Sequence, residues 1–170
     1  EKITYDTTST GTITLDDAVF TNAGITNLDI RDTEATAGLT VTASALSAAN
    51  SVTVTDNGGN ITSSYTGGAG DDTFKVTINH ATALAAADTI TGGKGTDELI
   101  VTAGNASLTQ ATQSGVTAVE KITFVGTAAK TIGYTLDDAT FVTTALAAVS
   151  GVVDASGMTG SGALTFIGTA

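Results

Sequence analysis

Two nine-residue segments constrain the fold of this chain more than any other feature. Residues 67–75 read GGAGDDTFK and residues 92–100 read GGKGTDELI, and both follow the pattern G-G-x-G-x-D-x-U-x, where U is a large apolar residue. The glycines predict a tight turn with close backbone approach, and the apolar residue predicts a short strand against a core. Phe74 and Leu99 are therefore expected to point inward, while Lys75 and Glu98 face solvent. Two complete matches carry far more weight than one.

The oxygen atoms of these turns suit a hard cation. Calcium takes six to eight oxygen ligands at about 2.3–2.6 Å. A six-residue turn supplies several carbonyl oxygens if its backbone curves inward, which a Cβ atom would obstruct. The aspartate at the sixth position adds charge on a short side chain. We therefore expect bound Ca²⁺, and the candidate ligands are Gly67, Gly68, Ala69, Gly70, Asp72, Asp88, Gly92, Gly93, Gly95 and Asp97.

The spacing of the motifs predicts where the aspartates lie. The motifs begin 25 residues apart. Two nonapeptides form one coil of about 18 residues, which leaves about seven inserted residues, placed within 79–87. Asp72 and Asp97 are then expected on the same edge of adjacent coils, with calcium between the two turns. Asp88 occupies the sixth position of a nonapeptide that has lost its glycines, so we expect it at the opposite edge, in a second site where Ser63 replaces the upstream partner.

Short alternating strands account for most of the remaining chain. Aromatic residues make up 5% of the sequence and tryptophan is absent, so the core must be thin and aliphatic. With 20 glycines, abundant threonine and no proline, the chain favours short strands between tight turns. This pattern predicts an all-β fold, a parallel β-solenoid or β-roll; β-sandwich repeats are the alternative, because alternation does not separate the two. Strands are expected at 3–5, 13–15, 39–41, 52–54, 74–78, 99–101, 122–125 and 164–167, and single helical turns at 81–87 and 144–150.

The sequence also repeats itself over a longer distance. The first five residues, EKITY, recur as EKITF about 119 residues later, and the segment TLDDA recurs at a similar offset. A third match aligns residues 41–54 with residues 153–166. We therefore expect a first repeat unit at 1–119, with a calcium-binding nonapeptide region at 60–102, and a partial second unit at 120–170 of a longer array.

Charge and composition argue against several functions. The formal net charge of −11 repels nucleic acid and attracts cations. There is no cysteine, which excludes thiolate metal sites and disulfides. No apolar run approaches the roughly 18 residues of a membrane-spanning helix, so we expect no membrane insertion. His80 is the only histidine, which leaves neither a zinc triad nor a convincing nucleophile–histidine pair. We therefore expect the chain not to be an enzyme.

Two further patterns have a structural and a functional interpretation. The pairs Asp16-Asp17 and Asp137-Asp138 are either additional cation sites or, as we favour, helix N-termini or solvated turns. The Thr-x-Thr stretches at 40–42 and 53–55 invite comparison with ice-binding solenoids. Threonine also suits the outer face of a strand, and this is the interpretation that we favour.

Taken together, these features resemble the RTX (repeats-in-toxin) calcium-binding nonapeptide proteins, and most of all bacterial S-layer proteins of the RTX type. Beyond the nonapeptides, residues 119–124 (VEKITF), 153–156 (VDAS) and 162–166 (GALTF) are similar to the intervening segments of such proteins. The resemblance implies a β-roll, export by a type I system, and folding and assembly driven by calcium. It does not imply a continuous ladder of calcium ions, because long consecutive nonapeptide runs are missing.

The leading hypothesis is therefore structural: a secreted, self-assembling module of a bacterial surface layer or extracellular fibre. Its expected partners are copies of itself, with a cell-surface polysaccharide as a further candidate. The alternatives are a stalk or binding module of a large RTX adhesin and the C-terminal secretion domain of an exported hydrolase.

Overall fold

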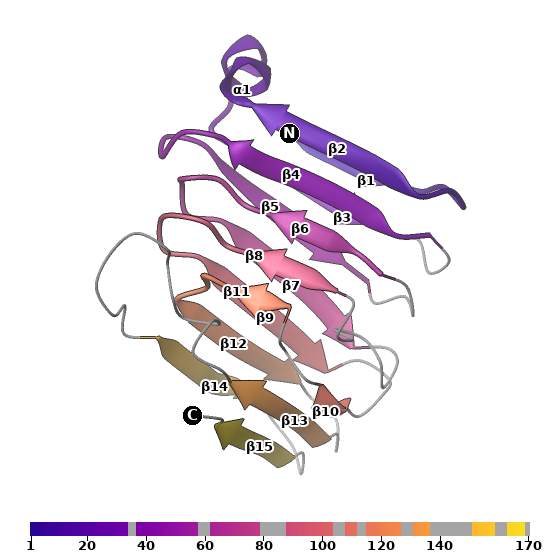
Figure 1. The fold of residues 1–170 in the computed structure, drawn as a ribbon, viewed down its shortest axis with the longest axis vertical. Helices are drawn as coiled ribbons and strands as arrows, with labels where there is room; N and C mark the ends of the chain where they lie inside the picture. Colours follow the sequence, from indigo (N-terminus) through magenta and orange to yellow (C-terminus); the bar gives the residue numbers. More distant parts are fainter. Residues whose placement is uncertain are drawn as a thin grey trace.

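The computed structural model describes residues 1–33, 37–57, 62–78, 88–103, 108–111, 115–126, 131–136, 151–158 and 163–168. In this part of the chain the strands stack in two layers, and from β1 to β10 and again from β11 to β15 each strand lies in the layer opposite the strand before it (Figure 1). Every described strand pairing is parallel. The fold is therefore the predicted parallel β-solenoid, and the β-sandwich alternative is wrong because sandwiches are built from antiparallel pairs.

One layer is a sheet of seven described strands in which each strand pairs with the next one along the chain in that layer. In order, these strands are β1 (Lys2–Tyr5), β3 (Asn27–Asp32), β5 (Ser51–Asp56), β7 (Thr73–Ile78), β9 (Glu98–Ala103), β12 (Lys121–Gly126) and β14 (Val152–Met158).

The facing layer consists of two shorter sheets within the described residues. The first contains β2 (Gly11–Asp16), β4 (Leu39–Ala45), β6 (Ser64–Thr66), β8 (Thr89–Thr91) and β11 (Val116–Thr117), and the second contains β10 (Leu108–Ala111), β13 (Thr131–Leu136) and β15 (Ala163–Gly168).

The core consists of columns of inward-facing side chains. Along the seven-stranded sheet, Ile30, Val54, Phe74, Leu99 and Ile122 are neighbours in register, and all five are almost completely buried. Each coil thus adds one apolar side chain to a column and packs mainly against the coils beside it. This arrangement makes a thin aliphatic core sufficient.

All eight predicted strands are present, and the structure adds strands that alternation did not reveal. β6 and β8 have three residues each, with Tyr65 and Ile90 as their buried members. A strand with one inward residue has no period to detect. β3 does alternate, but its apolar residues stand between charged ones. The predicted helical turns at 81–87 and 144–150 lie outside the described residues.

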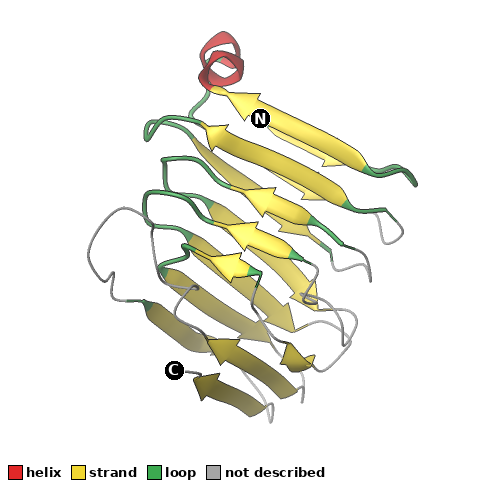
Figure 2. Cartoon of the chain, in the orientation of Figure 1, coloured by secondary structure: helices red, strands yellow, loops and turns green. Residues whose placement is uncertain are grey.

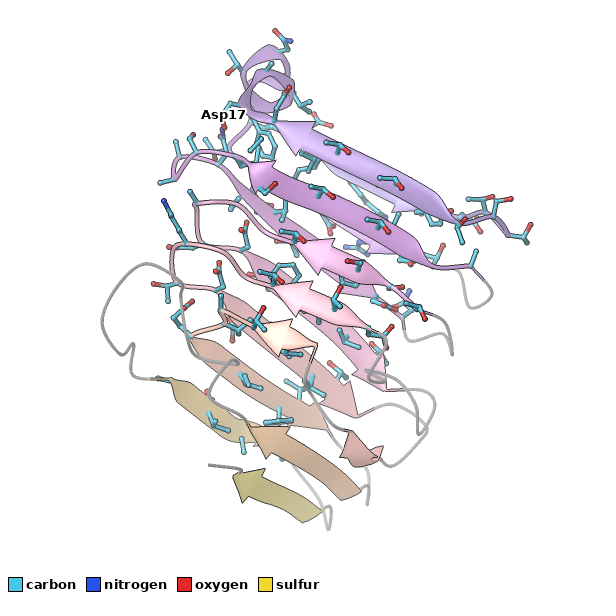
Figure 3. The ribbon with its side chains drawn as sticks, viewed as in Figure 1. Asp17 is labelled. Carbon is cyan, nitrogen blue, oxygen red and sulfur yellow. The ribbon has the colours of Figure 1, made fainter. Side chains whose placement is uncertain are left out.

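A short helix, α1 (Asp17–Ala23), lies at the first coil (Figure 2). Asp16 is its N-cap, and the Asp16 carboxylate accepts the backbone N–H groups of Ala18 and Val19. Asp17, labelled in Figure 3, accepts hydrogen bonds from the backbone N–H and hydroxyl of Ser47 and from the Asn50 side chain. These contacts lower the pKa of Asp17. The pair is thus a helix N-terminus, as favoured above, while Asp137 and Asp138 lie outside the described residues.

Threonines and one serine, Ser64, form two rows on the outer face of the five-stranded sheet. Residues 12, 40, 64 and 89 are in register in one row, and residues 14, 42, 66, 91 and 117 in the other. Hydroxyls bond to one another along the rows, between Ser64 and Thr89 at 2.7 Å and between Thr91 and Thr117 at 3.1 Å. Cross-strand pairs of this kind stabilise a sheet.

The third internal sequence match does not correspond to equivalent positions in the fold. Residues 41–44 belong to β4 in the five-stranded sheet, whereas residues 153–156 belong to β14 in the seven-stranded sheet. β12 and β14 are neighbours, as β1 and β3 are. The match therefore reflects the common composition of short strands and not a shared position in the coil.

The two faces of β9 provide a test of the solenoid. Leu99 is fully buried, and its neighbour Ile100 lies on the outer face, half-buried. We expect Leu99→Ala to lower the free energy of unfolding by about 2–5 kcal/mol because it leaves a cavity, and Ile100→Ala to cost much less. Urea unfolding in calcium measures both, and a larger loss for Ile100→Ala would contradict the assigned faces.

Candidate metal centre

The two glycine-rich turns lie on top of each other at one edge of the solenoid (Figure 1). The first connects β6 to β7 and the second connects β8 to β9. The Gly67 N–H donates to the Thr91 carbonyl at 2.8 Å, and the Lys94 N–H donates to the Gly68 carbonyl at 3.0 Å. The nonapeptides therefore occupy adjacent coils, as their spacing predicted, although coils here are longer than two nonapeptides.

Close stacking explains the glycines of the motif. A Cβ atom on Gly67 would overlap the Gly92 carbonyl oxygen and the Asp72 carboxylate, and one on Gly92 would overlap the Asp97 carboxylate. Gly93 has a φ of 115°, a conformation that side chains disfavour. The turns can therefore bring carbonyl and carboxylate oxygens together only with glycine at these positions.

The predicted aspartates belong to a ladder of carboxylates that connects successive coils. An Asp72 oxygen accepts the Val52 N–H at 2.7 Å. Asp97 accepts the Asp72 N–H at 2.8 Å, and Glu120 accepts the Asp97 N–H at 2.7 Å. Each acid thus bonds to the backbone of the preceding coil. We call Asp72, Asp97 and Glu120 the carboxylate ladder.

Burial makes the carboxylate ladder electrostatically costly. All three side chains are buried, Asp97 completely. Among the described residues, Asp97 Oδ2 and Glu120 Oε1 have no hydrogen-bond partner. Neither of the two ion pairs found in the described ranges, Arg31–Asp29 and Lys121–Glu98, includes a residue of the carboxylate ladder. Buried charge that is neither paired nor fully hydrogen-bonded is strongly unfavourable.

The pKa values of the ladder residues show the same electrostatic cost. The pKa of Asp97 is raised to about 8: burial is the largest cause, the hydrogen bond from the Asp72 N–H opposes it, and the nearby carboxylates of Asp72 and Glu120 add to it. Burial also raises the pKa of Asp72, although the N–H groups of Val52 and Gly68 oppose this shift. The carboxylate ladder therefore favours either a proton or a cation.

The residues fit a calcium ion in part. Asp97 and Glu120 each offer a buried oxygen without a partner, and the stacked turns place carbonyl groups nearby. Both oxygens of Asp72 already accept backbone N–H groups, from Val52 and from Gly68 at 2.6 Å, which leaves Asp72 with fewer lone pairs for an ion. No three acidic or histidine side chains in the described ranges converge on one point. An ion here would depend on backbone carbonyls for most of its ligands.

Asp88 lies at the opposite edge, directly before β8. Its carboxylate accepts the Ser63 N–H at 2.9 Å, across the same 25-residue interval that separates Asp97 from Asp72. Ser63 thus occupies the position one coil before Asp88 that Asp72 occupies before Asp97, as predicted.

The core positions of the motif are also as predicted, with Phe74 and Leu99 fully buried. His80 lies outside the described residues.

Sequence reasoning missed Glu120. Its segment was recognised as a repeat and not as part of the site, because no glycine motif precedes it. A signal was present nevertheless: an acid, one polar residue and then a large apolar residue occur at 72–74, 97–99 and 120–122. The intervals between these acids are 25 and 23 residues, which is one coil each.

Comparison of the chain with protein-family models, with curated proteins and with solved structures finds no match. Within the described residues, no helix has the length and apolar character needed to cross a bilayer.

The raised pKa of Asp97 predicts proton-dependent folding when calcium is removed. The unfolded carboxyl loses its proton near the ordinary pKa of 3.8, whereas the folded one holds it to about 8. Between these values unfolding releases a proton, so stability falls as the pH rises. In chelator we expect the β circular-dichroism signal to be retained near pH 5 and lost as the pH rises through about 8.

Two variants separate this effect from general acidity. Asp97→Asn should flatten the pH dependence in chelator, and Asp6→Asn, an exposed acid outside the turns, should leave it unchanged. A pH profile that Asp97→Asn does not alter would contradict the assignment to the carboxylate ladder.

Proposed function

We propose that this chain is a calcium-dependent structural module of a secreted bacterial surface layer or extracellular fibre. In this proposal calcium binds between the stacked glycine turns and neutralises the carboxylate ladder, so that the ion completes the fold. The folded module then assembles with copies of itself outside the cell, and it carries no catalytic activity.

The observation that carries the proposal is the buried acid of the ladder. Asp97 Oδ2 and Glu120 Oε1 lie in the interior with no partner among the described residues, directly beside turns whose glycines permit inward carbonyls. A proton can satisfy one such carboxylate, but at neutral pH a divalent cation neutralises two at once. The net charge of −11 further favours cation binding.

Linkage gives the size of the expected effect. If free calcium exceeds the dissociation constant by about 10- to 100-fold, each site contributes about 1.4–2.7 kcal/mol. Two sites would then supply several kcal/mol, a large share of the roughly 5–15 kcal/mol that stabilises a typical domain. Where calcium is scarce, the fold would lose this contribution and be easier to unfold, which favours export of the unfolded chain.

A stalk module of a large adhesin is the second candidate. The seven-stranded sheet continues without interruption past residue 120, because β9 pairs with β12 across the predicted boundary between repeat units. A continuous parallel sheet suits a stiff rod. The hydrolase secretion domain remains a third candidate, but no described feature favours it.

Calcium dependence can be tested at one carboxylate with a matched control. At pH 8, chelator should abolish the β circular-dichroism signal, and added calcium should restore it. Glu120→Gln should raise the calcium concentration for half-maximal folding by about tenfold, equivalent to about 1.4 kcal/mol. Glu1→Gln, the exposed equivalent in the first repeat unit, should have no effect. A spectrum unchanged in excess chelator would overturn the proposal.

Assembly separates the two leading candidates. Electron microscopy after calcium addition should show sheets or filaments if the module builds a surface layer. Monodisperse rods at the same concentrations would favour the adhesin stalk.

A further inference from the structure

The same short sequence occurs twice in the seven-stranded sheet, in two different surroundings. Residues 1–5 (EKITY) contain β1, and residues 120–124 (EKITF) contain the start of β12. β12 pairs with β9 on one side and with β14 on the other. β1 pairs with β3, and no other described strand pairs with it. The edge of β1 that corresponds to the β9 side of β12 is therefore open among the described strands, and we call it the open edge of β1.

Burial differs between the two copies of this sequence. Ile122 and Phe124 are both 0% exposed. Their equivalents in the first copy are less covered, because Ile3 is 36% exposed and Tyr5 is half-buried. Since the two sequences are nearly identical, the difference comes from the neighbouring strand and not from the side chains. β1 thus presents an apolar residue at an unpaired strand edge, which is a surface that can add a strand from another chain.

The contacts of β12 show what a strand on that side supplies. The Lys121 N–H donates to the Asp97 carbonyl at 3.0 Å, and the Glu120 carboxylate accepts the Asp97 N–H at 2.7 Å. On the outer face, the Lys121 ammonium pairs with the Glu98 carboxylate at 2.9 Å. Residues 1–2 repeat this glutamate and lysine. The open edge of β1 therefore carries the groups that hold β12 to a parallel neighbour.

The other end of the same sheet has a second open edge. β14 pairs with β12 and is the last strand of the sheet in the described part of the chain (Figure 1). The Val152 N–H donates to the Glu120 carbonyl at 2.8 Å. Because backbone groups alternate in direction along a strand, the N–H groups of Gly151 and Val153 point away from β12. We call this side of the strand the open edge of β14.

A second copy of the chain fits the open edge of β14 in a definite register. Its β1 would adopt the same partners in β14 that β12 has, with Lys2 opposite Val152 and Ile3 opposite Val153. Ile3 and Val153 then lie side by side on the inner face, where Val153 is half-buried against the core. The stack therefore buries apolar side chains at both ends, as neighbouring coils of a solenoid do.

The polar groups at the two open edges also match. In this register Glu1 lies opposite the Gly151 N–H, so it would continue the carboxylate ladder by one step. The charge of Lys121 acts on Asp154 from one side of β14, and Lys2 of the second copy would take the corresponding place on the other side. A two-fold contact between two β1 strands offers Glu1 and Lys2 neither of these partners.

We propose that a second copy of this chain docks end to end, with its β1 added in parallel to the open edge of β14, so that the seven-stranded sheet continues from one copy to the next. Such a contact joins two different surfaces and does not close on itself, so it produces a filament. The proposal rests on the self-assembly in the function proposed above and specifies the contact that performs it. It does not depend on an ion at the glycine turns.

Single cysteines test the pairing directly, because the chain has none of its own. Residues opposite each other on neighbouring strands are about 4.8 Å apart, which is within the reach of a disulfide. In calcium and under mild oxidation, Ile3→Cys mixed with Val153→Cys should give disulfide-linked dimers, and neither variant alone should. Thr12→Cys, on the outer face of the facing layer, should give no dimers when it is mixed with Val153→Cys.

A proline at the open edge of β1 supplies the second measurement. The carbonyls of Glu1 and Tyr5 accept N–H groups from the β3 side, so by alternation the Thr4 N–H points to the open edge. Thr4→Pro removes this donor and blocks the edge without removing a bond to β3. We expect it to abolish filaments in electron microscopy while the β circular-dichroism signal remains. Thr8→Pro, in the exposed loop after β1, should leave the filaments in place.

The outcomes separate this contact from the function proposed above. Dimers of Ile3→Cys alone would indicate a two-fold contact and overturn the proposal, as would the absence of mixed dimers between variants that circular dichroism shows to be folded. Filaments without mixed dimers would leave self-assembly standing and reject only this contact. If chelator alters neither the circular-dichroism spectrum nor the yield of mixed dimers, the calcium dependence is wrong and the contact stands.

Discussion

The contact between a carboxylate and the backbone N–H of the neighbouring coil is the interaction on which the rest of the structure depends. In a parallel solenoid the sheets hold the strands together, but some N–H groups in the turns and at the first residues of the strands find no carbonyl acceptor in the neighbouring strand. Asp72, Asp97 and Glu120 accept these groups from one coil to the next. Since buried N–H groups must find acceptors, the acids set the height at which each turn stacks on the one before it.

The same contact explains why the interior carries negative charge. A carboxylate accepts a hydrogen bond from an N–H group more strongly than a neutral oxygen does, and the short aspartate side chain fits the tight glycine turn. Its second oxygen, however, remains in the interior, as Asp97 Oδ2 and Glu120 Oε1 do. The acids thus hold the turns in register and at the same time oppose burial. Protons or cations resolve this conflict, which connects the stability of the fold to the composition of the surrounding solution.

The sequence predicted the architecture and the stacking of the two glycine turns, for a physical reason. Glycine turns and alternating apolar residues are local features, so the stacking of residues 67–75 on residues 92–100 followed from their spacing. Glu120 is not marked locally, because no glycine motif precedes it and its place beside Asp97 depends on the length of the coil between them. The hydrogen bonds of Asp72 were not predictable either: both of its oxygens accept backbone N–H groups, and these contacts depend on how the coils stack. Whether these residues bind an ion stays a prediction.

The hydrogen bonds of the carboxylate ladder also set what an ion at the glycine turns could gain. Backbone N–H groups already stabilise part of the negative charge of Asp72, Asp97 and Glu120. A cation beside these turns would therefore gain mainly from backbone carbonyl groups and from the two carboxylate oxygens that have no hydrogen-bond partner among the described residues, Asp97 Oδ2 and Glu120 Oε1. The amide of Glu120→Gln keeps an oxygen atom but removes the charge, so that variant measures how much of the gain is electrostatic.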